Sequence, residues 1–241
     1  MVSALATRAM AFACAVACAA GGAIAADVLP FSAHKPGALV ADHYRLIGIP
    51  KIPQNQFALV EDNGVTVLKV DSMSSASTVG LPLTATRETG ATLRWRWKVS
   101  HTLEAANPRT KPGDDFAGRV YVFFDVPLES LSFMDRAKIW FARAMSGMEV
   151  PTAAICYVWD HRETIGANFW SPYTKRVRIV VLRNESSGAN VWHEERRDLS
   201  ADFKSAFGFD MPRVTGVAVG SDTDNTMSRV TTWFGDVEIG K

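Results

Sequence analysis

The segment from Leu93 to Val99, with the sequence LRWRWKV, alternates strictly between apolar and basic side chains. A period of two places Leu93, Trp95, Trp97 and Val99 on one face of an extended chain, and the three basic residues on the other. No helical period fits this segment. It therefore predicts a β-strand with one buried face, and a fold in which sheets cover one another.

Strand patterns recur along the rest of the chain, separated by short loops. We expect strands at 57–61, 65–70, 119–125, 155–159, 176–182, 214–221 and 231–239, and a weaker one at 191–196. Asp62-Asn63-Gly64 lies between the first two and predicts a tight hairpin. Helices do not alternate with these strands. The sequence therefore predicts an all-β fold, an antiparallel β-sandwich of the jelly-roll type.

Two segments have apolar residues at helical spacing. Residues 128–145, followed by Gly147, predict an inserted amphipathic helix. This helix either packs on a sheet face or docks a protein partner or a membrane surface. Residues 200–207, followed by Gly208, predict one short helix. The polar stretch 72–77 is expected to be a flexible loop.

The N-terminus has the parts of an export signal. Arg8 is the only charge before an Ala-rich apolar stretch, and Ala23-Ile24-Ala25 supplies the small residues that signal peptidase recognises. We expect a signal peptide over 1–25, one mature domain over 26–241 and a periplasmic location. The apolar stretch is shorter than the ~20 residues of a membrane span, so the mature chain should have no transmembrane segment. Cys18 offers lipidation as an alternative, although Ala rather than Leu begins its recognition box.

Charge and cysteine content narrow the class of protein. The chain has 26 basic and 25 acidic residues, and cleavage of the signal removes Arg8 alone, which leaves the mature protein formally neutral. Nucleic-acid binding demands clustered positive charge, so this class is disfavoured. The mature chain keeps only Cys156, in an apolar strand pattern that predicts a buried, unreactive thiol.

Six segments together form a recognisable series. They are 93–99 (LRWRWKV), 113–121 (GDDFAGRVY), 157–160 (YVWD), 212–217 (PRVTGV), 221–226 (SDTDNT) and 233–236 (WFGD). In this order they resemble a family of bacterial exported proteins catalogued as domain of unknown function 3047, over roughly residues 44–239. The resemblance implies an exported sandwich-type domain and implies no activity.

The acidic segment 221–226 is the best candidate site. Asp222, Asp224 and Asn225 bring oxygen-bearing side chains into one turn between two predicted strands, as in part of a hard-cation loop. The later Gly and distal Glu of an EF-hand are absent. Asp and Asn also stabilise turns by bonding their own backbone. We favour that role, with calcium at Asp222 and Asp224 as the alternative, and Asp236 either joins this site or ends its strand.

One predicted strand carries a polar and aromatic strip. Arg119, Tyr121, Phe123 and Asp125 share one of its faces. Rings that stack on a pyranose and charged groups that bond its hydroxyls make such a strip suitable for gripping sugars. Aromatic residues also favour strands for packing alone, so both interpretations stay open.

Carboxylates outside the acidic turn support an enzymatic alternative. A glycan hydrolase needs two carboxyl groups ~5–10 Å apart across one cleft, and Asp115, Asp125, Asp160 and Glu163 are the candidates. Asp114 adjoins Asp115, but neighbours on a strand point to opposite faces, so these two should not act together. The sequence lacks a serine-hydrolase elbow, and its five histidines lack the spacing of zinc ligands.

The sequence therefore favours a non-catalytic periplasmic sandwich that binds a carbohydrate or another envelope ligand. The expected binding residues are Arg119, Asp160, Asp222, Asp224 and Asn225, with Arg94 and Arg96 as secondary candidates. The alternatives are a glycan-acting hydrolase or lyase, and an envelope assembly protein that docks a protein partner through 128–145.

Overall fold

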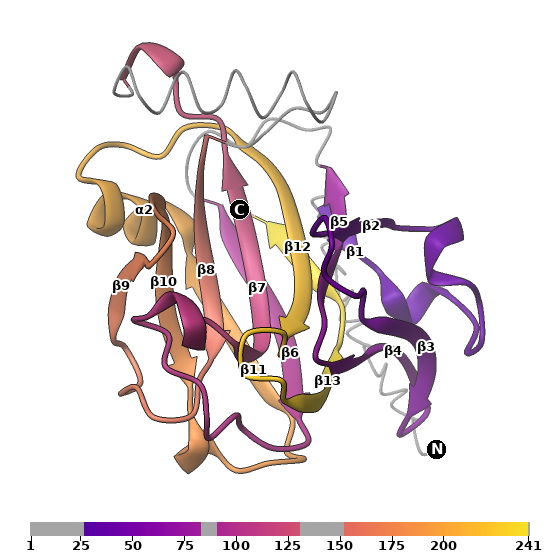
Figure 1. Ribbon diagram of the computed structural model, residues 1–241. Helices are drawn as coiled ribbons and strands as arrows, with labels where there is room; N and C mark the ends of the chain where they lie inside the picture. Colours follow the sequence, from indigo (N-terminus) through magenta and orange to yellow (C-terminus); the bar gives the residue numbers. More distant parts are fainter. Residues whose placement is uncertain (1–26, 83–90, 131–151, 241) are drawn as a thin grey trace, which may run out of the picture.

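The computed structural model describes residues 27–82, 91–130 and 152–240, which form two facing β-sheets (Figure 1). The first sheet contains, in order, β1 (Asp27–Leu29), β14 (Val237–Gly240), β6 (Thr92–Val99), β13 (Arg229–Phe234), β4 (Val65–Met73) and β3 (Gln56–Asp62), and β11 (His193–Asp198) also pairs with β6. The second contains β2 (Arg45–Gly48), β5 (Ala76–Pro82), β12 (Val214–Asp222), β7 (Phe116–Phe124), β8 (Ala153–Trp159), β10 (Thr174–Arg183) and β9 (Asn168–Ser171).

The chain crosses repeatedly from one sheet to the other, as in a jelly roll. Strands β4, β6, β11 and β13 lie in the first sheet, whereas β5, β7, β10 and β12 lie in the second. All strand pairs in the described ranges are antiparallel except β8 and β10, which are parallel. The predicted all-β sandwich is confirmed, with one sheet mixed rather than purely antiparallel.

The core lies between the sheets and follows the predicted alternation. The four apolar residues of β6 are all buried. The ring of Trp97 contacts that of Trp159 from the opposite sheet, with centroids 5.5 Å apart, and that of Phe234 at 6.3 Å. Burial of such large aromatic side chains stabilises the sandwich through apolar area and ring contacts.

The predicted strand over 231–239 is wrong in one respect, because it consists of two strands. β13 ends at Phe234 and β14 begins at Val237. The residues between them leave the ladder. Asp236 accepts hydrogen bonds from the backbone nitrogen of Ser32 (2.9 Å) and from its hydroxyl (2.5 Å), and so anchors the N-terminal segment rather than the acidic turn.

The prediction of a flexible loop over 72–77 is wrong, because these residues end β4 and begin β5. The hydroxyls of Ser72, Ser75 and Ser77 are buried and hydrogen-bonded. Ser75 donates to Asn55 Oδ1 at 2.7 Å, and the Ser72 hydroxyl lies 3.0 Å from that of Thr223. Hydroxyl groups satisfied in this way can lie inside a protein, which composition alone did not indicate.

Helical structure is short in the described ranges. Helix α2 (Leu199–Phe207) confirms the predicted short helix: Asp198 caps its start, and Gly208 ends it with a φ of 84°. Five 3₁₀ turns occur, η1 (Phe31–Ala33), η2 (Val40–Asp42), η3 (Lys111–Gly113), η4 (Leu128–Ser130) and η5 (Glu185–Ser187). Most of the predicted helix 128–145, and the predicted signal over 1–25, lie outside the described residues. Within the described part of the chain, no helix is long and apolar enough to cross a membrane.

Candidate functional site

The candidate site lies at one end of the second sheet, where the start of β7 meets the end of β12. Phe116 of β7 is paired in register with Asp222 of β12. Arg119 faces outward from β7, because its neighbours Val120 and Val122 belong to the core. Two of the predicted binding residues, far apart in sequence, are thereby brought together.

Arg119 is the centre of a buried polar network on this face. Its Nη2 pairs with the carboxylate of Asp222 and donates to the backbone oxygen of Asp114 at 2.6 Å. Its Nη1 donates to the Tyr121 hydroxyl at 2.7 Å, and the guanidinium lies 4.5 Å above the Phe116 ring. The side chains of Arg119 and Asp222 are only 10% and 11% exposed, so the pair is shielded from solvent. A buried charge pair is tolerated only when both partners are hydrogen-bonded in this way.

Asp115 holds the acidic turn in place. It is fully buried. One carboxylate oxygen accepts from the backbone and side-chain nitrogens of Asn225, both at 3.2 Å, and the other accepts from the nitrogen and hydroxyl of Thr226, at 2.7 and 2.5 Å. Asp115 therefore stabilises the turn from a distant part of the sequence. The side-chain nitrogen of Asn225 is used in this contact.

The three carboxylates of the turn region could in principle hold a cation. One oxygen from each of Asp115, Asp222 and Asp224 lies within 4.8 Å of the others. However, Asp222 already pairs with Arg119 and accepts from the Phe116 nitrogen at 2.9 Å, while Asp115 accepts four hydrogen bonds. Arg119 supplies the positive charge that calcium would bring. This donor set favours the turn-stabilising role over the calcium site.

Asp114 is a functional candidate that the sequence reasoning did not single out. It is 6% exposed, and its Oδ1 has no hydrogen-bond partner among the described residues. The Nε of Arg119 is also buried without a hydrogen-bond partner among the described residues. Burial raises the pKa of Asp114 to about 6, with Arg119 opposing the shift and Asp115 adding to it. Asp114 and Asp115 differ in their contacts, but both precede β7, so the strand alternation expected from the sequence does not apply to them.

Tyr173, in the turn between β9 and β10, forms the exposed rim of this region. Its ring is 55% exposed, and its hydroxyl donates to the backbone oxygen of Lys111 at 3.1 Å. Burial, then Asp114 and Asp224, raise the pKa of the Tyr173 hydroxyl, which reflects how near these carboxylates lie. Asp224 is half-buried, and its own pKa is raised by burial and by Asp115. No sequence signal linked Tyr173 to the acidic turn.

Asp160 caps a separate loop instead of joining this network. Its Oδ2 accepts from the backbone nitrogens of Arg162 (2.9 Å) and Glu163 (2.6 Å). No hydrogen bond or ion pair connects it to Arg119 or to the acidic turn within the described ranges. Its Oδ1 is buried and, like Asp114 Oδ1, has no hydrogen-bond partner among the described residues, but the contacts do not join Asp160 to the other predicted binding residues.

Each carboxylate of the enzymatic alternative already accepts hydrogen bonds or pairs with an arginine. Glu163 forms a bidentate pair with Arg109, at 2.6 and 3.0 Å. Asp125 pairs with Arg213 at the far end of β7 from Asp115, roughly 30 Å away at ~3.3 Å per residue. Asp160 and Glu163 lie in one loop, where Asp160 Oδ2 accepts from the Glu163 nitrogen, but Glu163 is already paired with Arg109.

The aromatic strip of β7 is present on the outer face of the second sheet. The rings of Tyr121 and Phe123 stack with centroids 5.7 Å apart and planes 8° from parallel, and both side chains are half-buried. The secondary candidates Arg94 and Arg96 lie on the outer face of the first sheet, and so belong to a different surface.

Buried Cys156 agrees with the expectation of an unreactive thiol. It is 1% exposed and unpaired, and burial raises its pKa to about 12. A thiolate is therefore disfavoured at this position.

Comparison with solved structures finds distant likenesses of fold. The cellulose induced protein Cip1 shares 13% identity at a TM-score of 0.37, over 82% of this chain and 90% of that protein. The xyloglucanase domain of NopAA, a type three effector from Sinorhizobium fredii in complex with cellobiose, shares 10% identity at a TM-score of 0.42, over 86% and 97%. At these values neither likeness bears on the ligand of this protein.

Sequence comparison places the chain in a family. No curated protein matches it in sequence. The model of a family described as proteins of unknown function, DUF3047, matches residues 42–238, which is most of the chain. The predicted resemblance is confirmed: the protein belongs to the DUF3047 family.

Proposed function

We propose that this protein is exported to the periplasm and binds a carbohydrate of the cell envelope without converting it. The proposed site is the end of the second sheet where Asp114, Arg119 and Tyr173 meet. The observation that carries the proposal is two buried atoms without a hydrogen-bond partner in the described structure, Asp114 Oδ1 and Arg119 Nε, on residues whose Oδ2 and Nη2 atoms lie 3.8 Å apart.

Unpaired polar atoms inside a protein are costly, and a ligand can satisfy them. A carboxylate oxygen accepts a hydrogen bond, whereas a guanidinium N–H donates one. A sugar hydroxyl can do both at once, because it donates through its hydrogen and accepts through its oxygen. The pair of unsatisfied groups therefore complements a hydroxyl-rich ligand better than a purely anionic or purely cationic one.

Side chains around Asp114 and Arg119 offer further contacts for a sugar. Tyr173 presents an exposed ring on which a pyranose can stack, and half-buried Asp224 offers a further acceptor. The Nζ of exposed Lys111 lies 5.4 Å from the Tyr173 ring. Because the unpaired atoms of Asp114 and Arg119 are covered, side chains at this rim must shift when the ligand enters.

Thermal melting of the mature protein against a panel of neutral and amino-sugar oligosaccharides tests the proposal. A ligand at ~100 times its dissociation constant stabilises the folded state by about 2.7 kcal/mol, which shifts the melting temperature visibly. Chromatography of the same mixtures should return the sugar unchanged. New products would instead support the enzymatic alternative, whereas the absence of any shift across the panel would contradict carbohydrate binding.

A further inference from the structure

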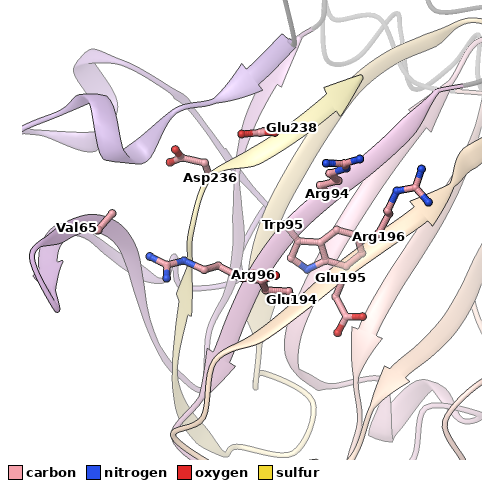
Figure 2. Close-up of a pocket in the computed structure, with 9 residues that line it drawn as sticks. All are labelled: Val65, Arg94, Trp95, Arg96, Glu194, Glu195, Arg196, Asp236 and Glu238. Atoms are coloured by element: carbon pink, nitrogen blue, oxygen red, sulfur yellow. The ribbon is translucent and has the colours of Figure 1, made fainter. Parts of the chain in front are cut away.

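A second candidate site lies on the outer face of the first sheet. Here β6, β11 and β14 border an open groove of about 460 Å³ (Figure 2). Three arginines and several carboxylates line it, namely Arg94, Arg96, Arg196, Glu194, Glu195, Asp236 and Glu238.

Two of these arginines face each other directly. Arg94 of β6 is paired in register with Arg196 of β11, and Figure 2 shows both guanidinium groups on the same side of the groove. Like charges opposite one another on neighbouring strands destabilise a sheet. Across the described residues, no carboxylate lies close enough to either arginine to form an ion pair, although Glu238 is the register partner of Arg94 on its other side.

The third arginine is held in place by its neighbours. A Cβ atom at Gly235 would lie 2.6 Å from Arg96 Cγ and 2.7 Å from its Nε, so glycine is needed there to make room for this side chain. The Arg96 guanidinium lies 4.6 Å from the ring centre of Trp192. Lys98 also lies near Trp192, at 5.0 Å, so positive charge and aromatic surface are interleaved.

We propose that this groove binds a polysaccharide through an anionic group, a carboxylate or a phosphate, held between Arg94 and Arg196. Guanidinium groups suit such planar or multi-oxygen anions because each can donate two parallel hydrogen bonds. A bound anion would also relieve the repulsion between the two facing arginines. Arg96 would donate a further hydrogen bond to the ligand from its position next to this pair. There, the half-buried ring of Trp192 offers apolar surface to a sugar.

The carboxylates of the groove restrict the class of polymer. Glu194 is paired in register with Arg96, and Glu238 with Arg94. These acids can accept hydrogen bonds from sugar hydroxyls, whereas they repel the closely spaced phosphates of nucleic acid, which offers them few hydroxyl groups. The mixture fits a glycan in which anionic groups alternate with hydroxyl groups.

Isothermal titration calorimetry on the full mature chain tests this proposal, with oligogalacturonate, inorganic phosphate and a neutral cello-oligosaccharide as probes. We expect oligogalacturonate or phosphate to bind in a salt-dependent manner, and the comparison of these two identifies the anion. Arg94→Ala and Arg196→Ala should each weaken that binding roughly tenfold, the effect of losing a hydrogen bond to a charged group. Glu194→Gln should strengthen it, because it removes a repulsive charge.

Arg229→Ala is the matched control, since it removes an exposed arginine from the same sheet at the far end of β13. It should leave the affinity unchanged, and melting curves should show that all variants fold. The proposal is overturned if neither anion binds the wild-type protein, or if Arg94→Ala and Arg196→Ala bind as well as Arg229→Ala. Since none of these substitutions touches Asp114 or Tyr173, the result is separate from that for the carbohydrate site above.

Discussion

Arg119 and Asp222 form a buried ion pair between neighbouring strands of the second sheet, and this pair joins the start of β7 to the end of β12. Replacing Asp222 by Asn leaves the guanidinium buried without its counter-charge. We predict that this variant loses about 3–5 kcal/mol of unfolding free energy, as expected when one partner of a buried pair is removed. Urea denaturation measures the loss.

The exposed pair of Arg213 and Asp125 provides the comparison for that experiment. Its side chains are 47% and 44% exposed, so solvent screens their interaction. Arg213→Ala should therefore change the unfolding free energy by less than about 1 kcal/mol. If both substitutions cost equally little, Arg119 and Asp222 do not form the shielded pair described above.

Asp115 gives a second prediction, which concerns the acidic turn. Asp115→Asn places an amide NH₂ group against donors from Asn225 or Thr226, because both carboxylate oxygens already accept hydrogen bonds. We expect a loss of about 2 kcal/mol or more. Asp42→Asn, at an exposed carboxylate, should have little effect. Equal melting temperatures for the two variants would show that Asp115 does not hold the turn.

Calcium gives a third prediction. Because Arg119 already neutralises Asp222 and because Asp115 is fully hydrogen-bonded, adding millimolar calcium or a chelator should leave the melting temperature unchanged. Differential scanning calorimetry with each addition measures this. A rise with calcium that disappears in Asp224→Asn would instead support calcium binding, the alternative that the sequence left open for this turn.

The fourth prediction concerns pH. Burial raises the pKa of Asp114 in the folded state to about 6, above the value of ~3.9 for an unfolded aspartate. Between these values the folded state binds more protons than the unfolded state. The contribution of Asp114 to stability is therefore full at low pH and declines as the pH rises through this window, by at most roughly 1.4 kcal/mol per pH unit.

Asp114→Asn isolates that contribution from those of other carboxylates. Between pH 4 and pH 7, the unfolding free energy of the wild type should fall relative to that of the variant as the pH rises. Urea titrations at several pH values measure it. A difference that stays constant across this range would mean that Asp114 titrates normally in the folded protein.

The regular part of the fold was predictable from sequence because its signal is local. The alternation in Leu93 to Val99 and the turn at Asp62-Asn63-Gly64 each identify structure within a few residues. Strand β5 escaped notice because it begins in a polar stretch, and the burial of its Ser77 depends on Asn55 from a distant segment. Local composition carries no information about such partners.

The candidate site was predictable only in part for the same reason. The sequence identified Arg119, Asp222 and Asp224 as candidates. It did not show that Arg119 pairs with Asp222 and so neutralises the carboxylate that calcium would bind. Tyr173 approaches the acidic turn across 52 positions of sequence, from a turn with no distinguishing motif. Asp114 was visible, but its unpaired oxygen is a property of the folded packing.

Calorimetric titration of the best-stabilising oligosaccharide into wild type and three variants tests whether the sugar binds at Asp114 and Tyr173. Tyr173→Ala removes the exposed ring, Tyr173→Phe keeps the ring without its hydroxyl, and Asp114→Asn replaces the unpaired acceptor. We predict that Tyr173→Ala and Asp114→Asn each weaken binding roughly tenfold or more, while Tyr173→Phe stays close to wild type. Equal affinities for wild type, Tyr173→Ala and Asp114→Asn would contradict the account, because the sugar would then bind elsewhere on the protein.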